Sequence, residues 1–203
     1  MTDEGDFRGF YAVPFDPAAA GALERAARKE LEASPEDGWR PVPAERLHIT
    51  LKFLGDAPTR LLPGLREALC ATAGEAAPFP VAFGGWIRLP GPRDPRVFAV
   101  EVSDPTGTLP RLAASLEARA ESLGFPKEGR PFLCHATVAR RRGGGRRPGR
   151  SRRRAKSATA VPGPASTVGV ETNLDRIVLM KSTLGPEGPA YEVGAEAALG
   201  GRG

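Results

Sequence analysis

Two short motifs constrain this chain more than any other feature. His48-Ile49-Thr50 lies within residues 47–55, LHITLKFLG, and His135-Ala136-Thr137 lies within residues 134–140, CHATVAR. Both segments alternate apolar and polar residues and are rich in β-branched side chains, a pattern that predicts strands. Side chains at i and i+2 share one face of a strand, so each histidine should point the same way as its threonine. The chain contains only these two histidines.

Each motif taken alone has an ordinary structural explanation. A single strand histidine is more often a hydrogen-bonded structural residue than a catalytic one, because short motifs match by chance. A metal site would need a fuller ligand set than two histidines and two cysteines that are far apart in the chain. The repetition of the motif, with both histidines inside it, favours a site with an acid on one side and a base on the other.

Residues outside the two motifs also match a known family. The matching segments are residues 8–13, 39–55, 132–140, 179–182 and 188–191. On these segments the chain resembles the bacterial RNA 2′,3′-cyclic phosphodiesterases, historically called 2′-5′ RNA ligases, of the two-histidine phosphoesterase superfamily. The resemblance implies an α+β fold with two similar lobes. Each lobe would be an antiparallel sheet with helices on its outer face, and the active-site groove would lie between the lobes.

The hydrophobic pattern predicts the elements of such a fold. We expect helices over residues 18–33, capped by Asp16, over 59–73 and over 106–123. Besides the two motif strands, we expect strands over residues 8–15, 79–89, 96–102, 168–170, 176–183 and 191–195. Residues 1–203 are therefore interpreted as one two-lobed phosphoesterase domain.

A block of positive charge follows the second motif. Residues 140–156 contain nine Arg and one Lys with no acidic residue, which leaves 19 basic and 24 acidic residues elsewhere. Residues 141–165 have almost no large apolar side chain, so we predict a disordered Arg/Gly-rich insertion there. Two interpretations stay open. The insertion could be solvated and without function, or it could attract the phosphate backbone of RNA.

The composition indicates a cytoplasmic protein. No apolar run is long enough to span a bilayer, and the acidic start, residues 2–4, is unlike a signal peptide. Cys70 and Cys134 match no zinc or redox pattern, so reduced thiols are expected. We expect a monomer without membrane contacts.

The paired motifs suit the opening of a 2′,3′-cyclic phosphate by water. One histidine would take a proton from water while the other protonates the leaving ribose oxygen. The hydroxyls of Thr50 and Thr137 could donate hydrogen bonds to the phosphate. The resemblance implies His48 as the general acid and His135 as the general base, although the sequence permits the reverse. This scheme requires no metal or other cofactor.

Three further residues could extend the site. The resemblance implies that Arg140 contacts phosphate, but strict alternation would turn it away from His135, so the strand must end or bulge before it. Lys52 would share the face of His48, either at the phosphate or as a solvated lysine. Trp39 could stack on a base, but packing against the body of the protein is favoured.

These observations favour one function over two alternatives. The leading hypothesis is metal-independent hydrolysis of RNA 2′,3′-cyclic phosphate ends to a 2′-phosphate, with reversible 2′-5′ ligation as a minor activity. RNA with such ends, or a related nucleotide, would be the partner. The alternatives are a noncatalytic RNA- or nucleotide-binding module and a phosphodiesterase for a small cyclic nucleotide. The presence of both histidines favours hydrolysis.

The Arg-rich insertion yields a first prediction. Deleting residues 141–156, which carry nine of the ten positive charges, should raise KM for long RNA and flatten its salt dependence. A cyclic mononucleotide should be hydrolysed as before, because it has no phosphate backbone for the insertion to attract. Steady-state kinetics at several salt concentrations measure both effects. An equal loss on both substrates would make the segment part of the fold or of the active site.

Overall fold

The computed structural model describes residues 5–33, 38–91, 95–141, 161–185 and 188–200. Its helices are α1 (Pro17–Glu32), α2 (Leu62–Ala73) and α3 (Thr108–Ser122), with single 3-10 turns η1 (Ala44–Arg46) and η2 (Thr59–Leu61). Its strands are β1 (Asp6–Pro14), β2 (Trp39–Pro41), β3 (His48–Pro58), β4 (Phe79–Leu89), β5 (Val97–Ser103), β6 (His135–Arg141), β7 (Val161–Thr167), β8 (Glu171–Leu174), β9 (Arg176–Gly185) and β10 (Gly188–Ala198).

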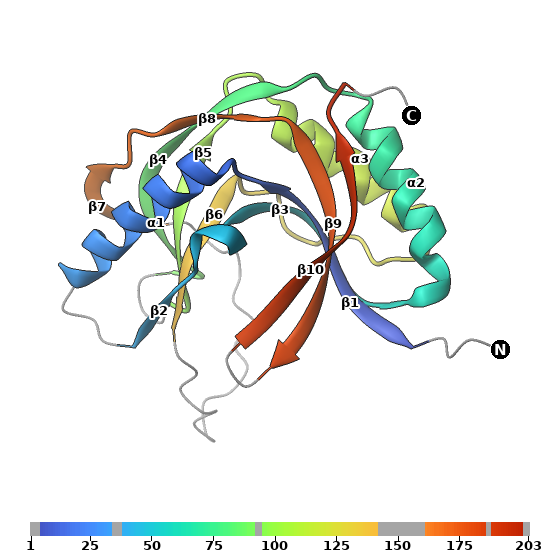
Figure 1. The fold of residues 1–203 in the computed structure, drawn as a ribbon, viewed down its shortest axis with the longest axis horizontal. Helices are drawn as coiled ribbons and strands as arrows, with labels where there is room; N and C mark the ends of the chain where they lie inside the picture. The colour runs from blue at the N-terminus through green and yellow to red at the C-terminus, as the bar shows by residue number, and fades with distance from the viewer. Residues whose placement is uncertain (1–4, 34–37, 92–94, 142–160, 186–187, 201–203) are drawn as a thin grey trace.

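The strands of the described residues form one curled antiparallel sheet (Figure 1). The main order is β10-β9-β1-β3-β6-β5-β4-β7, with β2 beside β6 and β8 beside β4. The two halves meet at the motif strands, where Ile49 of β3 pairs with Ala136 of β6. The α+β class is confirmed, but the two separate sheets that we expected are joined into one through this contact.

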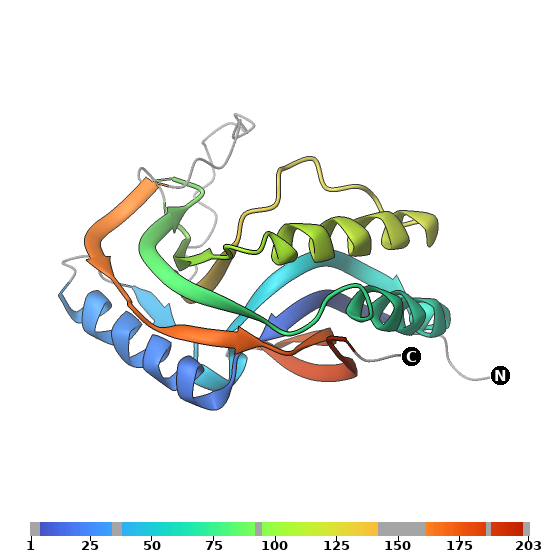
Figure 2. The same cartoon turned by 90° about the horizontal axis from the view of Figure 1, so that it is seen from above.

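The helices cover the outer face of the sheet. Buried side chains of all three helices share one hydrophobic core with Ile49 and Ala136. The helices α2 and α3 pack together over the half that contains β3, whereas α1 packs against β2 and β6 of the other half (Figures 1 and 2). Asp16 caps α1 as predicted, accepting hydrogen bonds from the backbone N–H groups of Ala18 and Ala19. In the described ranges, no helix is both long and apolar enough to cross a membrane.

The predicted and observed elements differ mainly in the second half. Residues 168–170, predicted as a strand, connect β7 to β8, and both of these strands pair with β4. The predicted insertion at 141–165 is too wide at both ends, because Arg141 closes β6 and residues 161–165 belong to β7. Pairing with a neighbouring strand satisfies backbone groups even where a segment lacks apolar side chains. Residues 142–160 lie outside the described part of the chain.

Lys52 does not lie on the face of His48, so both expectations for it are wrong. In the pairing of β1 with β3, Tyr11 opposes Lys52 and Ala12 opposes Thr50, which leaves Leu51 as the extra residue of a β-bulge. The bulge turns Lys52 towards the helices, where its side chain is only 1% exposed. Strict alternation in the sequence could not reveal this turn.

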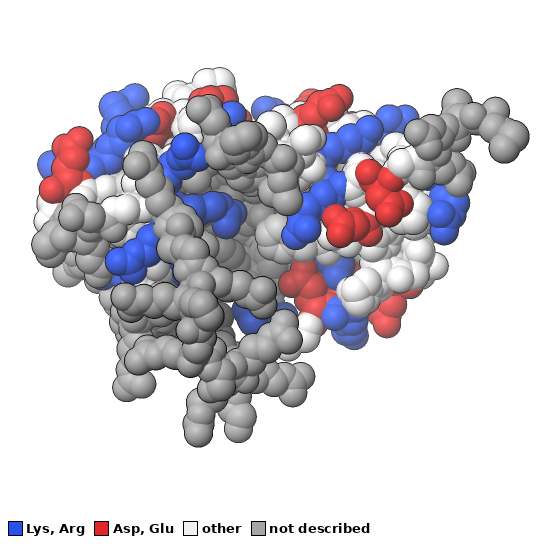
Figure 3. All heavy atoms as spheres, turned by 90° about the horizontal axis from the view of Figure 1, so that it is seen from below, with Lys and Arg blue, Asp and Glu red and all other residues white. Residues whose placement is uncertain are grey.

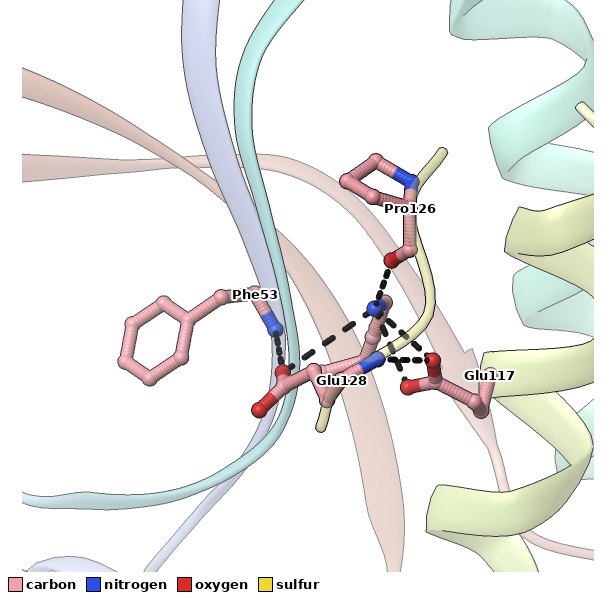
Figure 4. A network of polar contacts seen from close by, with 5 residues as sticks. Phe53, Glu117, Pro126 and Glu128 are labelled. Atoms are coloured by element: carbon pink, nitrogen blue, oxygen red, sulfur yellow. Dashed lines mark hydrogen bonds and ion pairs between the residues drawn. The ribbon is translucent and has the colours of Figure 1, made fainter. Parts of the chain in front are cut away.

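A cluster of polar contacts holds the buried ammonium group of Lys52 (Figure 4). Its Nζ lies 3.0 Å from Oε2 of Glu117 on α3 and donates a 2.9 Å hydrogen bond to the carbonyl of Pro126. Glu117 also accepts a 2.7 Å hydrogen bond from the backbone N–H of Glu128. The cluster therefore joins the first motif strand to the chain that leads towards the second.

Lys52→Met should destabilise the protein, because it leaves the Glu117 carboxylate and the Pro126 carbonyl without their cation. We expect a loss of about 2–4 kcal/mol in the free energy of unfolding, measured by urea denaturation. Lys52→Met/Glu117→Gln should lose less than the sum of the two single changes, because the uncompensated carboxylate is gone.

Arg176→Met provides the matched control. Its guanidinium lies 3.0 Å from the Asp175 carboxylate in a far more exposed pair, which should contribute less than about 1 kcal/mol. If Lys52→Met were no more harmful than this control, the cluster would have no structural role.

Candidate active site

Strand register brings the four motif side chains together. Because Ile49 opposes Ala136 in an antiparallel pair, His48 lies across from Thr137 and Thr50 lies across from His135. Ile49 and Ala136 are fully buried on the helix side, so the four flanking side chains emerge on the opposite, inner face. We call this inner surface the site face. The histidines occupy one diagonal of a four-residue block, and the hydroxyl groups occupy the other.

The two imidazoles are held in the same way. Nδ1 of His48 lies 2.7 Å from the carbonyl oxygen of Arg46, and Nδ1 of His135 lies 2.8 Å from that of Leu133. A carbonyl oxygen can only accept, so each Nδ1 must carry the hydrogen. In the neutral imidazole Nε2 is then the basic atom, and in the imidazolium it is the acidic one. Each histidine therefore offers Nε2 for proton transfer.

Aromatic rings surround His48. Phe10 of β1 stacks on its imidazole with centroids 5.0 Å apart, and Tyr191 of β10 meets it edge-on at 5.6 Å. The pKa of His48 is lowered to about 4, mainly by burial and in smaller part by the positive charges of Arg140 and of a protonated His135, while the hydrogen bond to the Arg46 carbonyl acts in the opposite direction. The imidazole is therefore neutral at pH 7 in the free site. The sequence analysis missed Phe10 and Tyr191, because only the strand order brings them to the motif.

His135 has a related environment. Burial is the main cause that lowers its pKa, and the charge of Arg140 acts in the same direction, while the hydrogen bond to Leu133 opposes them. Two neutral bases next to a guanidinium form a site that favours an anion, because a bound negative charge would stabilise the protonated form of either imidazole.

Arg140 reaches the site face through the irregularity that the sequence required. In the pairing of β5 with β6, Phe98 opposes Ala139 and Ala99 opposes Thr137, so Val138 is the extra residue of a β-bulge. Val138 and Ala139 are both buried, and Arg140 is exposed beyond them. The positive charge of Arg140 contributes to the lowered pKa of both imidazoles.

Other predicted candidates lie elsewhere. Lys52 belongs to the buried cluster on the helix side. Trp39 of β2 packs beside Phe98, with ring centroids 6.0 Å apart, as the packing interpretation expected. Within the described ranges, no three His, Cys, Asp or Glu side chains are grouped so that they could hold a metal ion.

The charge of the surface differs between the two halves. Seen from below (Figure 3), Lys and Arg side chains predominate over the half that contains β2 and β4–β6. Basic and acidic side chains mix over the half that carries α2 and α3. Arg140 is on the more basic half, so an anionic chain would be attracted to that side of the site.

Comparisons with known proteins agree with this fold. A family model described as LigT like Phosphoesterase matches residues 13–99. The RNA 2′,3′-cyclic phosphodiesterase of Thermus thermophilus is 33% identical, covering 92% of this chain and 87% of the relative. The protein of the same name from Archaeoglobus fulgidus is 32% identical, covering 91% of this chain and 96% of the relative.

Solved structures show the same architecture. TT0787 of Thermus thermophilus has a TM-score of 0.76 and 31% identity, covering 97% of this chain and 100% of that one. LigT of E. coli complexed with 3′-AMP has a TM-score of 0.68 and 24% identity, covering 96% of this chain and 98% of that one. The fold and its paired motifs thus define a phosphoesterase, which is a hydrolase. The chain belongs to the LigT-like phosphoesterase family, together with the relatives named RNA 2′,3′-cyclic phosphodiesterases.

The environment of His48 yields a prediction about stability. Its pKa is lowered from 6.5 to about 4 in the folded protein. Between these pH values the unfolded chain binds a proton that the folded chain does not, so acid should favour unfolding through His48. The His48→Gln variant lacks this proton, so its free energy of unfolding should fall less steeply from pH 6.5 to 4. The difference between the two proteins should change by up to about 3 kcal/mol over this range.

Urea denaturation at several pH values measures this difference. His135→Gln should show the same sign, because the pKa of His135 is also lowered. Parallel stability curves for wild type and His48→Gln would mean that His48 titrates alike in the folded and unfolded chains.

Proposed function

We propose that this phosphoesterase opens 2′,3′-cyclic phosphates at RNA ends, leaves a 2′-phosphate, and uses no metal. The observation that carries the proposal is the block formed by the two motifs. It sets two imidazoles with available Nε2 atoms on one diagonal and two hydroxyl groups on the other. The names of the relatives from Thermus thermophilus and Archaeoglobus fulgidus support the same substrate.

The diagonal arrangement fits an in-line displacement at phosphorus. The attacking water and the leaving oxygen must lie on opposite sides of the phosphorus atom, so a base and an acid are needed on opposite sides as well. With the phosphate over the centre of the block, His48 and His135 would flank it. The hydroxyl groups of Thr50 and Thr137 would donate to the nonbridging oxygens, whose charge grows in the transition state.

We assign His48 as the general acid and His135 as the general base. His135 would take a proton from water at Nε2, and His48 would give its Nε2 proton to the 3′ oxygen as the P–O3′ bond breaks. The low pKa of free His48 means that the acid must gain its proton together with the anionic substrate. The pKa of both imidazoles is lowered, so this direction does not distinguish the acid from the base, and the protonated imidazole must be identified in a complex.

Other residues and activities follow from this scheme. Arg140 would bind phosphate from the second half of the site. The same displacement, with an RNA 5′-hydroxyl in place of water as the nucleophile and the 3′ oxygen as the leaving group, would account for a minor 2′-5′ ligation. We also propose that residues 1–203 act as one monomeric domain, with the Arg-rich segment as an added contact to the RNA backbone.

Single changes at the two histidines test the proposed function. His48→Ala and His135→Ala should each lower kcat by at least about 100-fold on cyclic-phosphate-ended RNA, the usual scale for the loss of a general acid or base. Thr50→Val and Thr137→Val should lower kcat less, while Thr183→Val, an exposed change on β9, should have no effect. EDTA should leave the wild-type rate unchanged, and phosphorus NMR should show a 2′-phosphate product.

Each measurement tests a different part of the proposal. Full activity in either histidine variant would overturn the two-histidine mechanism, and abolition by EDTA would overturn metal independence. A 3′-phosphate product would require the substrate to bind the other way round. Adenosine 2′-phosphate is the product, so the base should hold the proton that it took from water. Imidazole NMR of this complex should therefore show a protonated His135, and a protonated His48 would reverse the acid and base. A panel of small cyclic nucleotides distinguishes RNA ends from a smaller substrate.

A further inference from the structure

Glu101 of β5 extends the four-residue block by one side chain. β5 pairs with β6 on the side away from β3, and Glu101 directly opposes His135 in that pairing. Directly opposed side chains of an antiparallel pair point to the same face, with Cβ atoms roughly 4.5–5.5 Å apart. One row across the site face therefore contains Thr50, His135 and Glu101. This row places a carboxylate beside the imidazole that we assigned as the general base.

The neighbours of Glu101 in β5 show which face it occupies. Val100 and Val102, on either side of it, are buried in the core that the helices share. Glu101 is exposed between them, as regular alternation requires, and the irregularity in the pairing of β5 with β6 lies further along, between Phe98 and Ala99. The carboxylate of Glu101 therefore lies on the same side of the sheet as the imidazole of His135.

The carboxylate of Glu101 is available to a ligand. Among the residues that the structure describes, it forms neither a hydrogen bond nor an ion pair. Gly84 of β4 lies beside it, and a Cβ atom added to this glycine would come within 3.6 Å of the Cβ atom of Glu101. Glycine at this position leaves the side chain of Glu101 uncrowded from β4. The carboxylate can therefore move over the site face towards His135.

Glu101 and Arg140 lie at opposite ends of the pairing between β5 and β6. Arg140 opposes Val97, which is four residues before Glu101, so the two charges are roughly 13 Å apart along the strands. A phosphate is attracted towards the guanidinium and repelled by the carboxylate. The part of the site face next to Glu101 therefore suits a neutral group that donates hydrogen bonds.

Water is such a group, and it has two hydrogens to donate. In the proposed hydrolysis the water oxygen attacks phosphorus, and one of its hydrogens passes as a proton to Nε2 of His135. The P–O3′ bond breaks, and the 3′ oxygen takes the proton from His48. The second hydrogen stays on the attacking oxygen and can be donated to a carboxylate. An alcohol, such as the 5′-hydroxyl of an RNA, has only the hydrogen that His135 takes.

We propose that Glu101 is a specificity-determining residue that favours water over a hydroxyl group as the nucleophile. Its carboxylate accepts the second hydrogen of the water molecule while Nε2 of His135 takes the first, so the two side chains orient one nucleophile. The carboxylate also repels the anionic backbone of an RNA that approaches with its 5′-hydroxyl. The inference rests on the proposed function, because it takes His135 as the base and a cyclic phosphate as the substrate.

Competition between water and methanol tests this role. In aqueous methanol, adenosine 2′,3′-cyclic phosphate yields adenosine 2′-phosphate by hydrolysis and its methyl ester by methanolysis, and phosphorus NMR measures both products. Glu101→Ala should lower the rate of hydrolysis by about 10- to 100-fold, the loss expected for a hydrogen bond to a charged group, and leave methanolysis unchanged. The ratio of ester to phosphate should rise by the same factor. Glu101→Gln, whose amide oxygen still accepts, should fall between wild type and Glu101→Ala.

Glu171→Ala is the matched control. Glu171 is an exposed residue of β8, which pairs with β4, and β4 in turn pairs with β5. Its substitution removes the same charge two strands away from Glu101, so the product ratio should equal that of wild type. The ratio is measured within one reaction, so it does not depend on how much of a variant is folded.

The outcomes distinguish this inference from the proposed function. An unchanged product ratio in Glu101→Ala would overturn the inference while hydrolysis by wild type left the proposed function standing. An equal fall in hydrolysis and methanolysis would also overturn it, because Glu101 would then act on the geometry of the site. An equal rise of the ratio in Glu171→Ala would do the same, because the effect would then come from net charge. A wild-type protein that hydrolysed no cyclic phosphate would overturn the proposed function and the inference together.

Discussion

The pairing of Ile49 with Ala136 holds the two motif strands side by side, and the geometry of the candidate site depends on it. Both residues are fully buried against the core that the three helices share. A slip of one residue in either strand would turn its histidine and threonine into that core and bring an apolar side chain to the site face. Burial of the Ile49 and Ala136 side chains therefore sets the register of the two strands, and with it the positions of the histidines and threonines. The stability of the core and the arrangement of the chemistry have the same physical origin.

A bulge directly after each motif has opposite consequences in the two halves. In β6 the bulge at Val138 returns Arg140 to the site face, whereas in β3 the bulge at Leu51 removes Lys52 from it. The ammonium group then becomes a structural cation that joins β3 to α3 and to the chain before the second motif. Both halves thus contain a β-bulge after the motif, but the residues that the two bulges turn have different roles. Arg140 therefore remains near the motif side chains, whereas Lys52 does not.

The electrostatics of the free site prepare it for an anion. Burial and the charge of Arg140 lower the pKa of both imidazoles, so neither is expected to be protonated near neutral pH before a ligand binds. The backbone carbonyls of Arg46 and Leu133 meanwhile fix which ring nitrogen is available. Binding of a phosphate and protonation of the acid should therefore be coupled. Such coupling would let the substrate complete the acid–base pair.

Much of this protein could be predicted from local sequence patterns. The strand motifs, the three helices, the cap at Asp16 and the need for an irregularity before Arg140 all follow from side-chain periodicity and backbone hydrogen bonding. These features depend on residues that are neighbours in the chain. Short-range information is sufficient for them, and the likeness to a known family added the order of the elements.

Contacts between distant segments decided the rest. The bulge that buries Lys52 is visible only in the pairing of β3 with β1, and the carboxylate that balances its charge comes from α3, 65 residues further along the chain. The rings of Phe10 and Tyr191 reach His48 from strands at opposite ends of the sequence. Periodicity determines the two faces of an isolated strand, but strand pairing determines where the alternation breaks and what covers each face. The sequence by itself therefore determined which residues could do the chemistry, and the tertiary structure decided which of them meet.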